Sequence, residues 1–160
     1  NEAGGEAFVL FPNMTAADGT AMVSGAQIQD TLTEFKIPYD IYLPFMPRVE
    51  CPGAFNLNYP EFAHALANAI ENGEFEKGIA ICGTGNGINM TLNHHAAIRS
   101  ALCWMPEIAA LARQHTDATV MVMPGRFIAT DSAKECVETF LNTPFEGGRH
   151  QNRITKMPCR

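Results

Sequence analysis

Short apolar runs alternate with amphipathic segments along the whole chain. Runs of four to six apolar residues suit buried strands, and apolar residues three and four positions apart mark helices between them. Such alternation favours a parallel sheet that is covered by helices on both faces. We therefore predict an α/β fold, with one three-layer domain over residues 1–160 and a doubly wound, Rossmann-like sheet of five parallel strands. The predicted strands are Phe8–Phe11, Tyr39–Leu43, Gly78–Cys82, Ile98–Cys103 and Thr119–Met123, and the predicted helices are Thr20–Phe35, Pro60–Asn72, Gly87–His95, Pro106–His115 and Asp131–Asn142.

Proline, glycine and aspartate sharpen the helix predictions. Pro60 suits a first helical position, and Gly73 can end the same helix. Asp131 is the expected N-cap of the last predicted helix. Helical periodicity is absent after Thr143 until Arg149. We therefore expect residues 143–160 to form a C-terminal extension that contributes to the functional site or to a dimer.

The amino-acid composition limits the possible binding partners of the protein and its cellular compartment. The formal net charge is −6, which argues against a nucleic-acid or membrane partner. No apolar run approaches the length of a membrane span, and Asn1–Glu6 lacks a signal-peptide core. The cysteines are scattered without a CxxC pair, so we expect neither disulfides nor a zinc site, and a reducing, cytoplasmic setting. They are Cys51, Cys82, Cys103, Cys136 and Cys159.

The strongest local signal is a glycine-rich run after the third predicted strand. Cys82 is followed by Gly-Thr-Gly-Asn-Gly at residues 83–87 and then by a predicted helix. Glycines let the backbone approach a ligand closely, and amides at a helix start favour an anion or an oxyanion. The run is neither a P-loop nor a convincing dinucleotide fingerprint. Cys82 could act there as a base or nucleophile, but a tight turn with a small buried thiol is an equally open interpretation.

Histidine and arginine supply a second group of candidates. His115 ends the fourth predicted helix, where it could transfer protons or simply favour the helix dipole. Arg126 follows the fifth strand, and it should face the edge where parallel strands end and ligands bind. Arg149 and Arg153 would lie one turn apart on a helix and could hold a phosphate. The alternatives are a solvated loop charge for Arg126 and an exposed basic tail for the last two.

Together these segments resemble the family of ribose-5-phosphate isomerase B and galactose-6-phosphate isomerase. The similar stretches are residues 78–103, 112–128 and 140–154, and Asn-Tyr-Pro-Glu-Phe-Ala at 58–63 resembles the family's segment before its second helix. Each motif alone is common, but ICGTGxG, RQHxD and FEGGRHxxR in this order are specific. The resemblance implies a flavodoxin-like parallel sheet, in agreement with the alternation of strands and helices.

The resemblance also implies an activity, the interconversion of aldose and ketose phosphates through an enediolate. Cys82 matches the family's base, Thr84 a hydroxyl that contacts the sugar, and His115 the residue that opens the sugar ring. Family sites combine residues from two subunits, so a homodimer, or a tetramer built from it, is implied, without a metal or an organic cofactor. The resemblance implies that Arg149 and Arg153 bind the phosphate and that Arg126 is a further cationic contact. The implied contacts at the enediolate are Gly83, Gly85, Asn86 and Gly87.

The chain departs from the family pattern on the sugar side. In a gapless alignment, Asn13 and Met14 stand where the family has an Asp-His pair, and Thr116 replaces an Asn. We still expect Asn13 and Thr116 to contact the substrate, and we expect a changed sugar specificity rather than an inactive enzyme. The alternative is a non-catalytic or partner-dependent subunit that binds sugar phosphate. A nucleotide-binding flavodoxin-like module fits the fold but not the chemistry of the glycine turn.

All of these roles require one geometry. The thiol of Cys82 and the guanidinium groups of Arg149 and Arg153 must face a common cleft, either within one chain or between two. One end of that cleft would be reactive, and the other would hold an anion.

Overall fold

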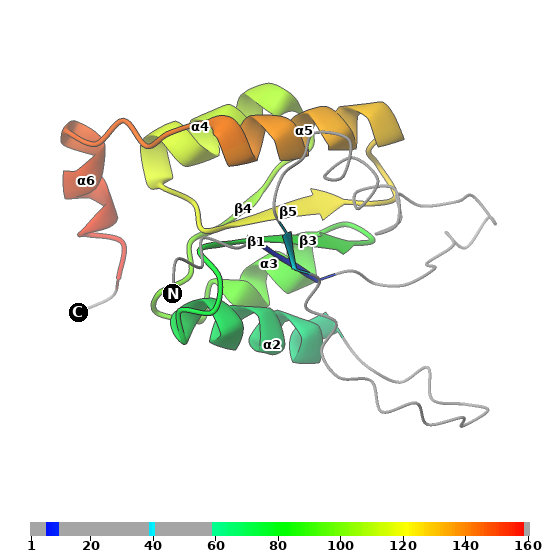
Figure 1. Cartoon of the computed structure of the whole chain (residues 1–160), viewed down its shortest axis with the longest axis horizontal. Coiled ribbons are helices and arrows are strands. Elements are labelled where there is room, and N and C mark those ends of the chain that lie inside the picture. Colours follow the sequence, from blue (N-terminus) through cyan, green and yellow to red (C-terminus); the bar gives the residue numbers. More distant parts are fainter. Residues whose placement is uncertain (1–5, 10–38, 41–58, 159–160) are drawn as a thin grey trace.

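The computed structural model describes residues 6–9, 39–40 and 59–158, which contain a parallel sheet with helices on both faces (Figure 1). The strands are β1 (Glu6–Val9), β2 (Tyr39–Asp40), β3 (Lys77–Cys82), β4 (Ser100–Leu102) and β5 (Val120–Pro124). They lie in the order β2-β1-β3-β5-β4, and every neighbouring pair is parallel. The predicted α/β class is therefore confirmed.

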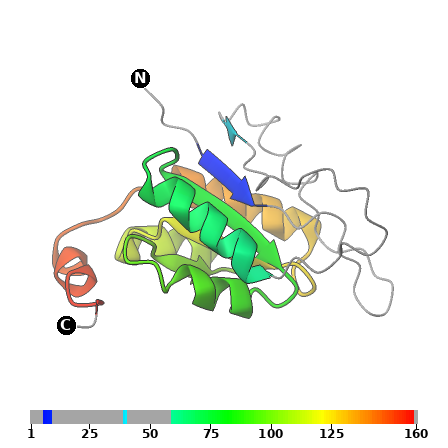
Figure 2. The same cartoon turned by 90° about the horizontal axis from the view of Figure 1, so that it is seen from below.

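The helices of the described residues form a layer on each face of the sheet. They are α2 (Tyr59–Glu71), α3 (Asn86–Leu92), α4 (Pro106–Thr116), α5 (Thr130–Asn142) and α6 (Arg149–Ile154). α2 and α3 cover one face, and α4 and α5 cover the other (Figure 1). α6 lies outside both layers, at the side of the sheet where the strands begin, and contacts α4 (Figure 2). None of these helices has the length and hydropathy that crossing a bilayer requires.

The two central strands are buried on both faces because their alternate side chains enter separate cores. Ile79 and Met121 pack in the core under α4 and α5. Ala80 and Val122, one residue further along each strand, pack in the core under α2 and α3. Successive side chains of a strand point to opposite faces. A central parallel strand such as β5 therefore has to be apolar throughout, as its sequence is.

The ends of the helices follow the sequence predictions in one case and depart from them in another. Gly73 ends α2 as expected: its φ is 76°, and its N–H donates to the Ile70 carbonyl at 3.0 Å. The expected N-cap at Asp131 is wrong, because Ala129 occupies that position and makes no side-chain cap. Asp131 instead lies in the first turn of α5, where its carboxylate still favours the helix dipole.

The three predicted strands that lie wholly within the described residues overlap β3, β4 and β5 but have other bounds. The predicted strands Phe8–Phe11 and Tyr39–Leu43 lie partly outside the described residues. The fourth was predicted from Ile98 to Cys103, yet it pairs only over the three residues of β4. The Arg99 N–H, just before β4, donates to the Thr119 side chain at 3.0 Å rather than to a strand carbonyl. The predicted helix Thr20–Phe35 lies outside the described residues.

The turn between β3 and α3 requires glycine at one position. Gly85 has a φ of 76°, in the left-handed region, and it caps α3. A Cβ on Gly85 would overlap the Leu102 side chain and lie 3.1 Å from Cγ1 of Val122. Both the backbone conformation and the surrounding side chains therefore exclude a larger residue.

Replacing Gly85 by alanine is expected to destabilise the fold more than replacing Gly73. Both residues have a φ of 76°, so each variant carries a backbone cost of about 1–2 kcal/mol. Nothing lies within 4 Å of a Cβ on Gly73, whereas Gly85→Ala adds overlap worth about 1–3 kcal/mol. Urea unfolding of the two variants measures the difference. Equal losses would show that the side chains around Gly85 move aside freely.

A matched pair of leucines tests where the core lies. Leu66 in α2 is 0% exposed and Leu111 in α4 is 44% exposed. Leu66→Ala is expected to lower the free energy of unfolding by about 2–5 kcal/mol, because it removes buried surface and leaves a cavity. Leu111→Ala should cost less than about 1 kcal/mol. Similar costs in denaturant unfolding would contradict the packing of α2 on the sheet.

Candidate active site

Cys82 is the last residue of β3 and lies at the edge where the strands end. Its side chain is partly buried, and residues 83–87 lead from it directly into α3. Gly83 and Gly85 are buried, whereas Thr84 and Asn86 are exposed. The Asn86 N–H donates to the Thr84 hydroxyl at 3.3 Å. The predicted residues from Cys82 to Gly87 thus form one compact turn with its polar side chains open to solvent.

The turn after β5 holds Arg126 against this glycine turn. The Gly125 N–H donates to the Cys82 carbonyl at 2.9 Å, and the Arg126 N–H donates to the Gly83 carbonyl at 3.1 Å. The Arg126 side chain lies so close that a Cβ on Gly83 would be 3.3 Å from its Nε. An exposed guanidinium therefore lies beside the glycine turn, at the edge that the sequence predicts for it.

The remaining candidates lie on α4 and α6. His115 is in the last turn of α4, and its ring stacks on that of His150, with centroids 4.3 Å apart and planes 6° apart. His150 is only 3% exposed. Burial lowers the pKa of His150, as do the neighbouring His115, Arg149 and Arg153, so its ring is neutral at pH 7. Arg149 and Arg153 are exposed and lie one turn apart on α6.

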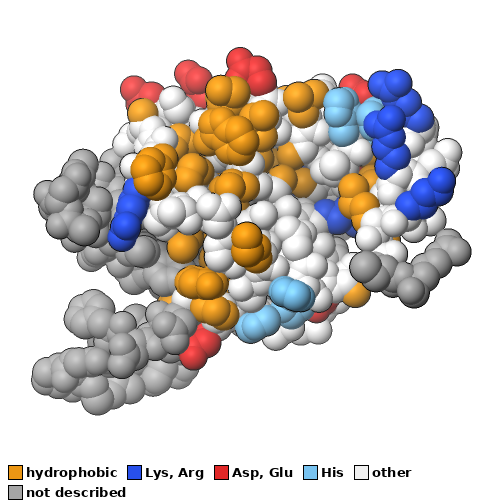
Figure 3. Space-filling model, turned by 180° about the vertical axis from the view of Figure 1, so that it is seen from behind, with side chains coloured by type: hydrophobic (Ala, Val, Ile, Leu, Met, Phe, Trp, Pro, Cys, Tyr) orange, Lys and Arg blue, Asp and Glu red, His pale blue; other side chains and the backbone are white. Residues whose placement is uncertain are grey.

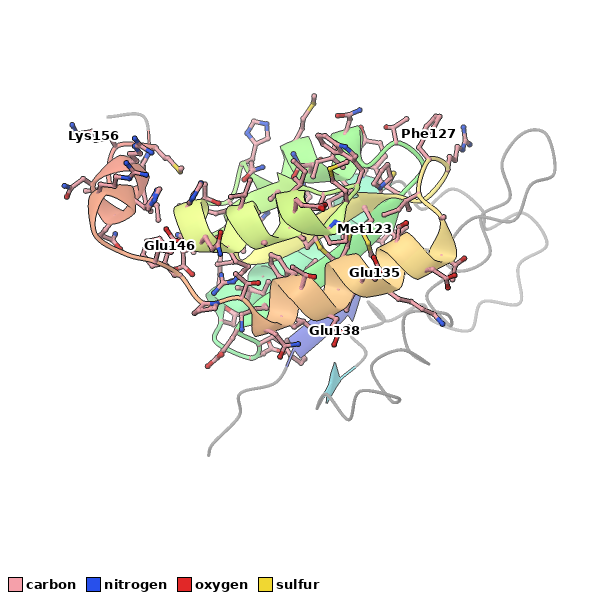
Figure 4. All side chains as sticks on the ribbon, turned by 90° about the horizontal axis from the view of Figure 1, so that it is seen from above. Met123, Phe127, Glu135, Glu138, Glu146 and Lys156 are labelled. Carbon is pink, nitrogen blue, oxygen red and sulfur yellow. The ribbon has the colours of Figure 1, made fainter. Side chains whose placement is uncertain are left out.

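Within one chain, Cys82 and the helix end that carries His115 lie at opposite edges of the sheet. Cys82 ends β3 level with Pro124, whereas α4 ends just before β5 begins at Val120. The residues of β5 span roughly 16 Å between these edges. Figure 4 shows the same separation, with Phe127 near one end of the molecule and Lys156 at the other. The common cleft expected for the thiol and the two arginines therefore does not form within a single chain.

Two further candidates complete the set. Asn13 lies outside the described residues. Thr116 follows His115 at the end of α4, and its hydroxyl donates to the Ala112 carbonyl at 2.6 Å. That hydroxyl has only its acceptor lone pairs left for a substrate.

The sequence reasoning missed a cluster of His115, Glu146 and His150. Their potential ligand atoms lie within 4.8 Å of one another, and Nε2 of His150 is 3.6 Å from Oε2 of Glu146. The stacked rings are nearly parallel, so their in-plane lone pairs cannot converge on one ion as metal ligands must. The arrangement is thus a stacked pair with a nearby carboxylate rather than a metal centre. The four-residue spacing of Glu146 and His150 is visible in the sequence, but the contact with His115 is not.

Comparisons with known proteins show the family to which the chain belongs. The sequence pattern of the Ribose/Galactose Isomerase family matches residues 48–157. Ribose-5-phosphate isomerase B of Escherichia coli (strain K12) is 42% identical over 97 residues, which is 61% of this chain and 65%, just under two thirds, of that protein.

Two solved structures are similar over nearly the whole chain. The ribose 5-phosphate isomerase of Thermotoga maritima has a TM-score of 0.77 and 32% identity, with 97% of each chain covered. Ribose-5-phosphate isomerase B of Mycoplasma genitalium, with bound ribulose 5-phosphate, has a TM-score of 0.74 and 32% identity, with 95% of this chain and 93% of that chain covered. The family pattern, the sequence identity and the shared fold all point the same way: the chain belongs to the ribose/galactose isomerase family.

Proposed function

We propose that this chain interconverts an aldose phosphate and a ketose phosphate, of the ribose 5-phosphate and ribulose 5-phosphate type, with Cys82 as the base. One observation carries the proposal: a partly exposed thiol begins a glycine turn against which the Arg126 guanidinium packs. The similar proteins support the substrate class, since one of them holds ribulose 5-phosphate. The proposed reaction uses neither a metal nor an organic cofactor.

The chemistry requires a base and an acceptor for negative charge. The Cys82 thiolate would remove a proton from C2 of the aldose, next to the C1 carbonyl, and return it to C1. The proton of the C2 hydroxyl would pass to the oxygen on C1, so the carbonyl moves from C1 to C2. The enediolate between these steps is an oxyanion that needs hydrogen-bond donors. The first amides of a helix have no partner within it, so the turn from Gly83 to Gly87 can supply such donors. The exposed Thr84 hydroxyl would contact the sugar.

A second copy of the chain would complete the site. We assign ring opening to His115 and phosphate binding to Arg149 and Arg153, which lie at the opposite edge from Cys82. In a two-fold homodimer, the edge of one copy that carries Cys82 would meet the α4–α6 end of the other, twice over. Each of the two sites would then hold groups from both copies.

Exposed apolar side chains favour this contact. Met90 of α3 is 64% exposed, Trp104 and Met105 after β4 are 50% and 42% exposed, and Phe127 after β5 is 73% exposed. Figure 3 shows hydrophobic side chains gathered on one face, with Lys and Arg side chains towards its ends. Exposed apolar patches on soluble proteins commonly mark interaction sites.

The competing hypothesis is a non-catalytic or partner-dependent subunit, in which a different chain supplies the missing half. The separation of Cys82 from His115 is compatible with this hypothesis too. An assay of the purified chain alone distinguishes the two hypotheses. If the chain turns over its substrate without any other protein, copies of this chain are sufficient for activity. Testing aldose phosphates of four to six carbons in the same assay would identify the sugar. We propose that Asn13 and Thr116 contact this sugar.

Mixing two inactive variants tests the base and the shared site together. Cys82→Ala and His115→Ala each remove a proton-transfer group, so each alone is expected to lower kcat for ribose 5-phosphate by about 10²–10⁴-fold. In a mixed dimer, one site has both an intact thiol and an intact imidazole. After subunit exchange at equal amounts, roughly a quarter of the wild-type activity should return.

The matched control mixes Cys82→Ala with the double variant Cys82→Ala/His115→Ala, which cannot form an intact site and should stay inactive. Exchange of subunits without recovery in the first mixture would contradict the shared site. Wild-type turnover by Cys82→Ala alone would contradict the role of the thiol as base.

The cysteines of the described residues differ in exposure. Cys103 and Cys136 are fully buried, whereas Cys82 is only partly buried. Burial raises the pKa of Cys103 to about 12, with Cys136 as a smaller cause, and raises that of Cys136 to about 11, with Glu135 and Glu107 as smaller causes. The two buried groups are therefore neutral thiols at pH 8. Because all three are free, we propose a reducing, cytoplasmic location.

Iodoacetamide at pH 8 is expected to modify Cys82 in step with the loss of activity, because alkylation requires an accessible thiolate. Cys103 and Cys136 should stay unmodified until the protein is unfolded. Mass spectrometry of the digested protein measures each site, and ribose 5-phosphate should slow the reaction at Cys82 alone. Equal labelling of Cys82 and Cys103 in the folded protein would overturn the assignment.

A further inference from the structure

The end of α4, which presents His115, is fixed by a carboxylate between two arginines. Asp117 accepts a hydrogen bond from Nη1 of Arg113 at 2.8 Å and from Nη2 of Arg99 at 3.2 Å. Within the described ranges it is also the one non-glycine residue with a positive φ, 46°. Aspartate is among the few residues that tolerate this conformation. The chain therefore turns sharply just beyond the helix while the carboxylate is held on both sides.

The same arginines also bind the backbone at this helix end. Nε of Arg99 donates to the Thr116 carbonyl at 2.9 Å, and its Nη2 donates to the Asp117 carbonyl at 2.9 Å. Nη1 of Arg113 donates to the Ala118 carbonyl at 2.7 Å. The last carbonyls of a helix have no partner within it. Here guanidinium groups take that role, so the helix end cannot fray without breaking ionic hydrogen bonds.

Arg113 depends on Asp117 for its charge balance. It is only 8% exposed, and its guanidinium lies 5.7 Å from the centroid of the Phe140 ring. Its Nε donates to the Thr143 carbonyl at 3.3 Å, where α5 ends. A cation this deeply buried is strongly destabilising once its countercharge is removed. Loss of the Asp117 carboxylate would therefore loosen the contacts of Arg113 at the ends of both α4 and α5.

His115 lies between Arg113 and Asp117 in the sequence, at the helix end that these residues hold. Its ring packs flat on His150, and the carbonyl of Gln114 accepts the N–H of Glu146 at 3.1 Å. The helix end that carries His115 is thus joined to the segment that leads to α6. The direction of the imidazole follows from where that helix end is held.

We propose that Asp117 is a positioning residue for ring opening. Through Arg99 and Arg113, it fixes the helix end and so keeps the imidazole of His115 at the distance that proton transfer requires. This role rests on the proposed isomerase activity. Opening the ring of ribose 5-phosphate breaks the C1–O4 bond, while the C1 hydroxyl loses a proton and O4 gains one. Such transfers need heavy atoms within about 2.6–3.2 Å, so a small shift of the helix end slows them.

Asp117→Asn tests the proposal because it keeps the size and the tolerance for the left-handed backbone but removes the charge. The kcat/KM for ribose 5-phosphate is expected to fall about tenfold. Ribulose 5-phosphate has no furanose form, because its O5 carries the phosphate. Cys82 exchanges a C1 proton of ribulose 5-phosphate for solvent deuterium, which NMR can follow. The rate of this exchange should therefore fall less than about twofold.

The split between these two rates is the decisive readout, since a general loss of structure would lower both. Equal losses, or no loss in either, would overturn the positioning role. Glu135→Gln, which alters an exposed carboxylate of α5, should leave both rates unchanged. If Asp117→Asn does not fold, Arg99→Lys, which keeps the charge but cannot make all of the paired contacts, is expected to give the same split. A wild-type chain that turns over neither sugar phosphate would show that the proposed function itself is wrong, and the role of Asp117 with it.

Discussion

The common direction of the strands decides where each chemical group of this protein can lie. In the described part of the chain, the turns after β3, β4 and β5 lie at one edge of the sheet, and α2, α3 and α4 each lead back to the edge where the next strand begins. Cys82 is the last residue of β3, and Arg126 lies in the turn after β5. The two strands are paired in register, so the turns that follow them meet and share backbone hydrogen bonds. His115 lies in the last turn of α4, which leads back to the opposite edge of the sheet. No adjustment of side chains can close a gap of this origin, because the paired strands themselves set its length.

Because the site residues lie at two edges of the sheet, the proposed reaction would require contact between two copies of the chain. A sugar phosphate carries its carbonyl at one end and its phosphate at the other. Binding of the phosphate by Arg149 and Arg153 of one copy would orient the carbon chain towards Cys82 of the other. The phosphate does not react, but its binding energy can hold the reacting carbons in register with the base. Each copy would then supply one end of the substrate-binding site, and neither alone would position the sugar.

The sequence predicts those features that depend on neighbouring residues. Gly73 and Gly85 are read correctly as turn residues because a positive φ is a local requirement, and β5 is read as a buried strand because all of its residues are apolar. It does not reveal the stacking of His115 on His150, which joins distant segments. Nor does it reveal the burial of Arg113, since arginine is usually exposed. Asp131 is not the N-cap because α5 begins one residue earlier, at Thr130, and the preceding Ala129 is a residue type that capping preferences do not favour.

The neutral ring of His150 also bears on how α6 would hold the phosphate in the proposed reaction. A phosphate ester carries about −1.5 to −2 charges at pH 7, which two guanidinium groups can balance. Burial and the nearby cations lower the pKa of His150, so its folded form disfavours a third positive charge beside Arg149 and Arg153. The lowered pKa of His150 makes the free energy of unfolding depend on pH. The contribution of the neutral ring to stability is present above the ordinary histidine pKa of about 6.5 and is lost as the pH falls through the lowered pKa. The phosphate gains its own proton near pH 6, so a fall in pH weakens both the stack and the charge of the ligand. A buried, uncharged histidine beneath His115 therefore suits the proposed site, which would bind a dianion at neutral pH.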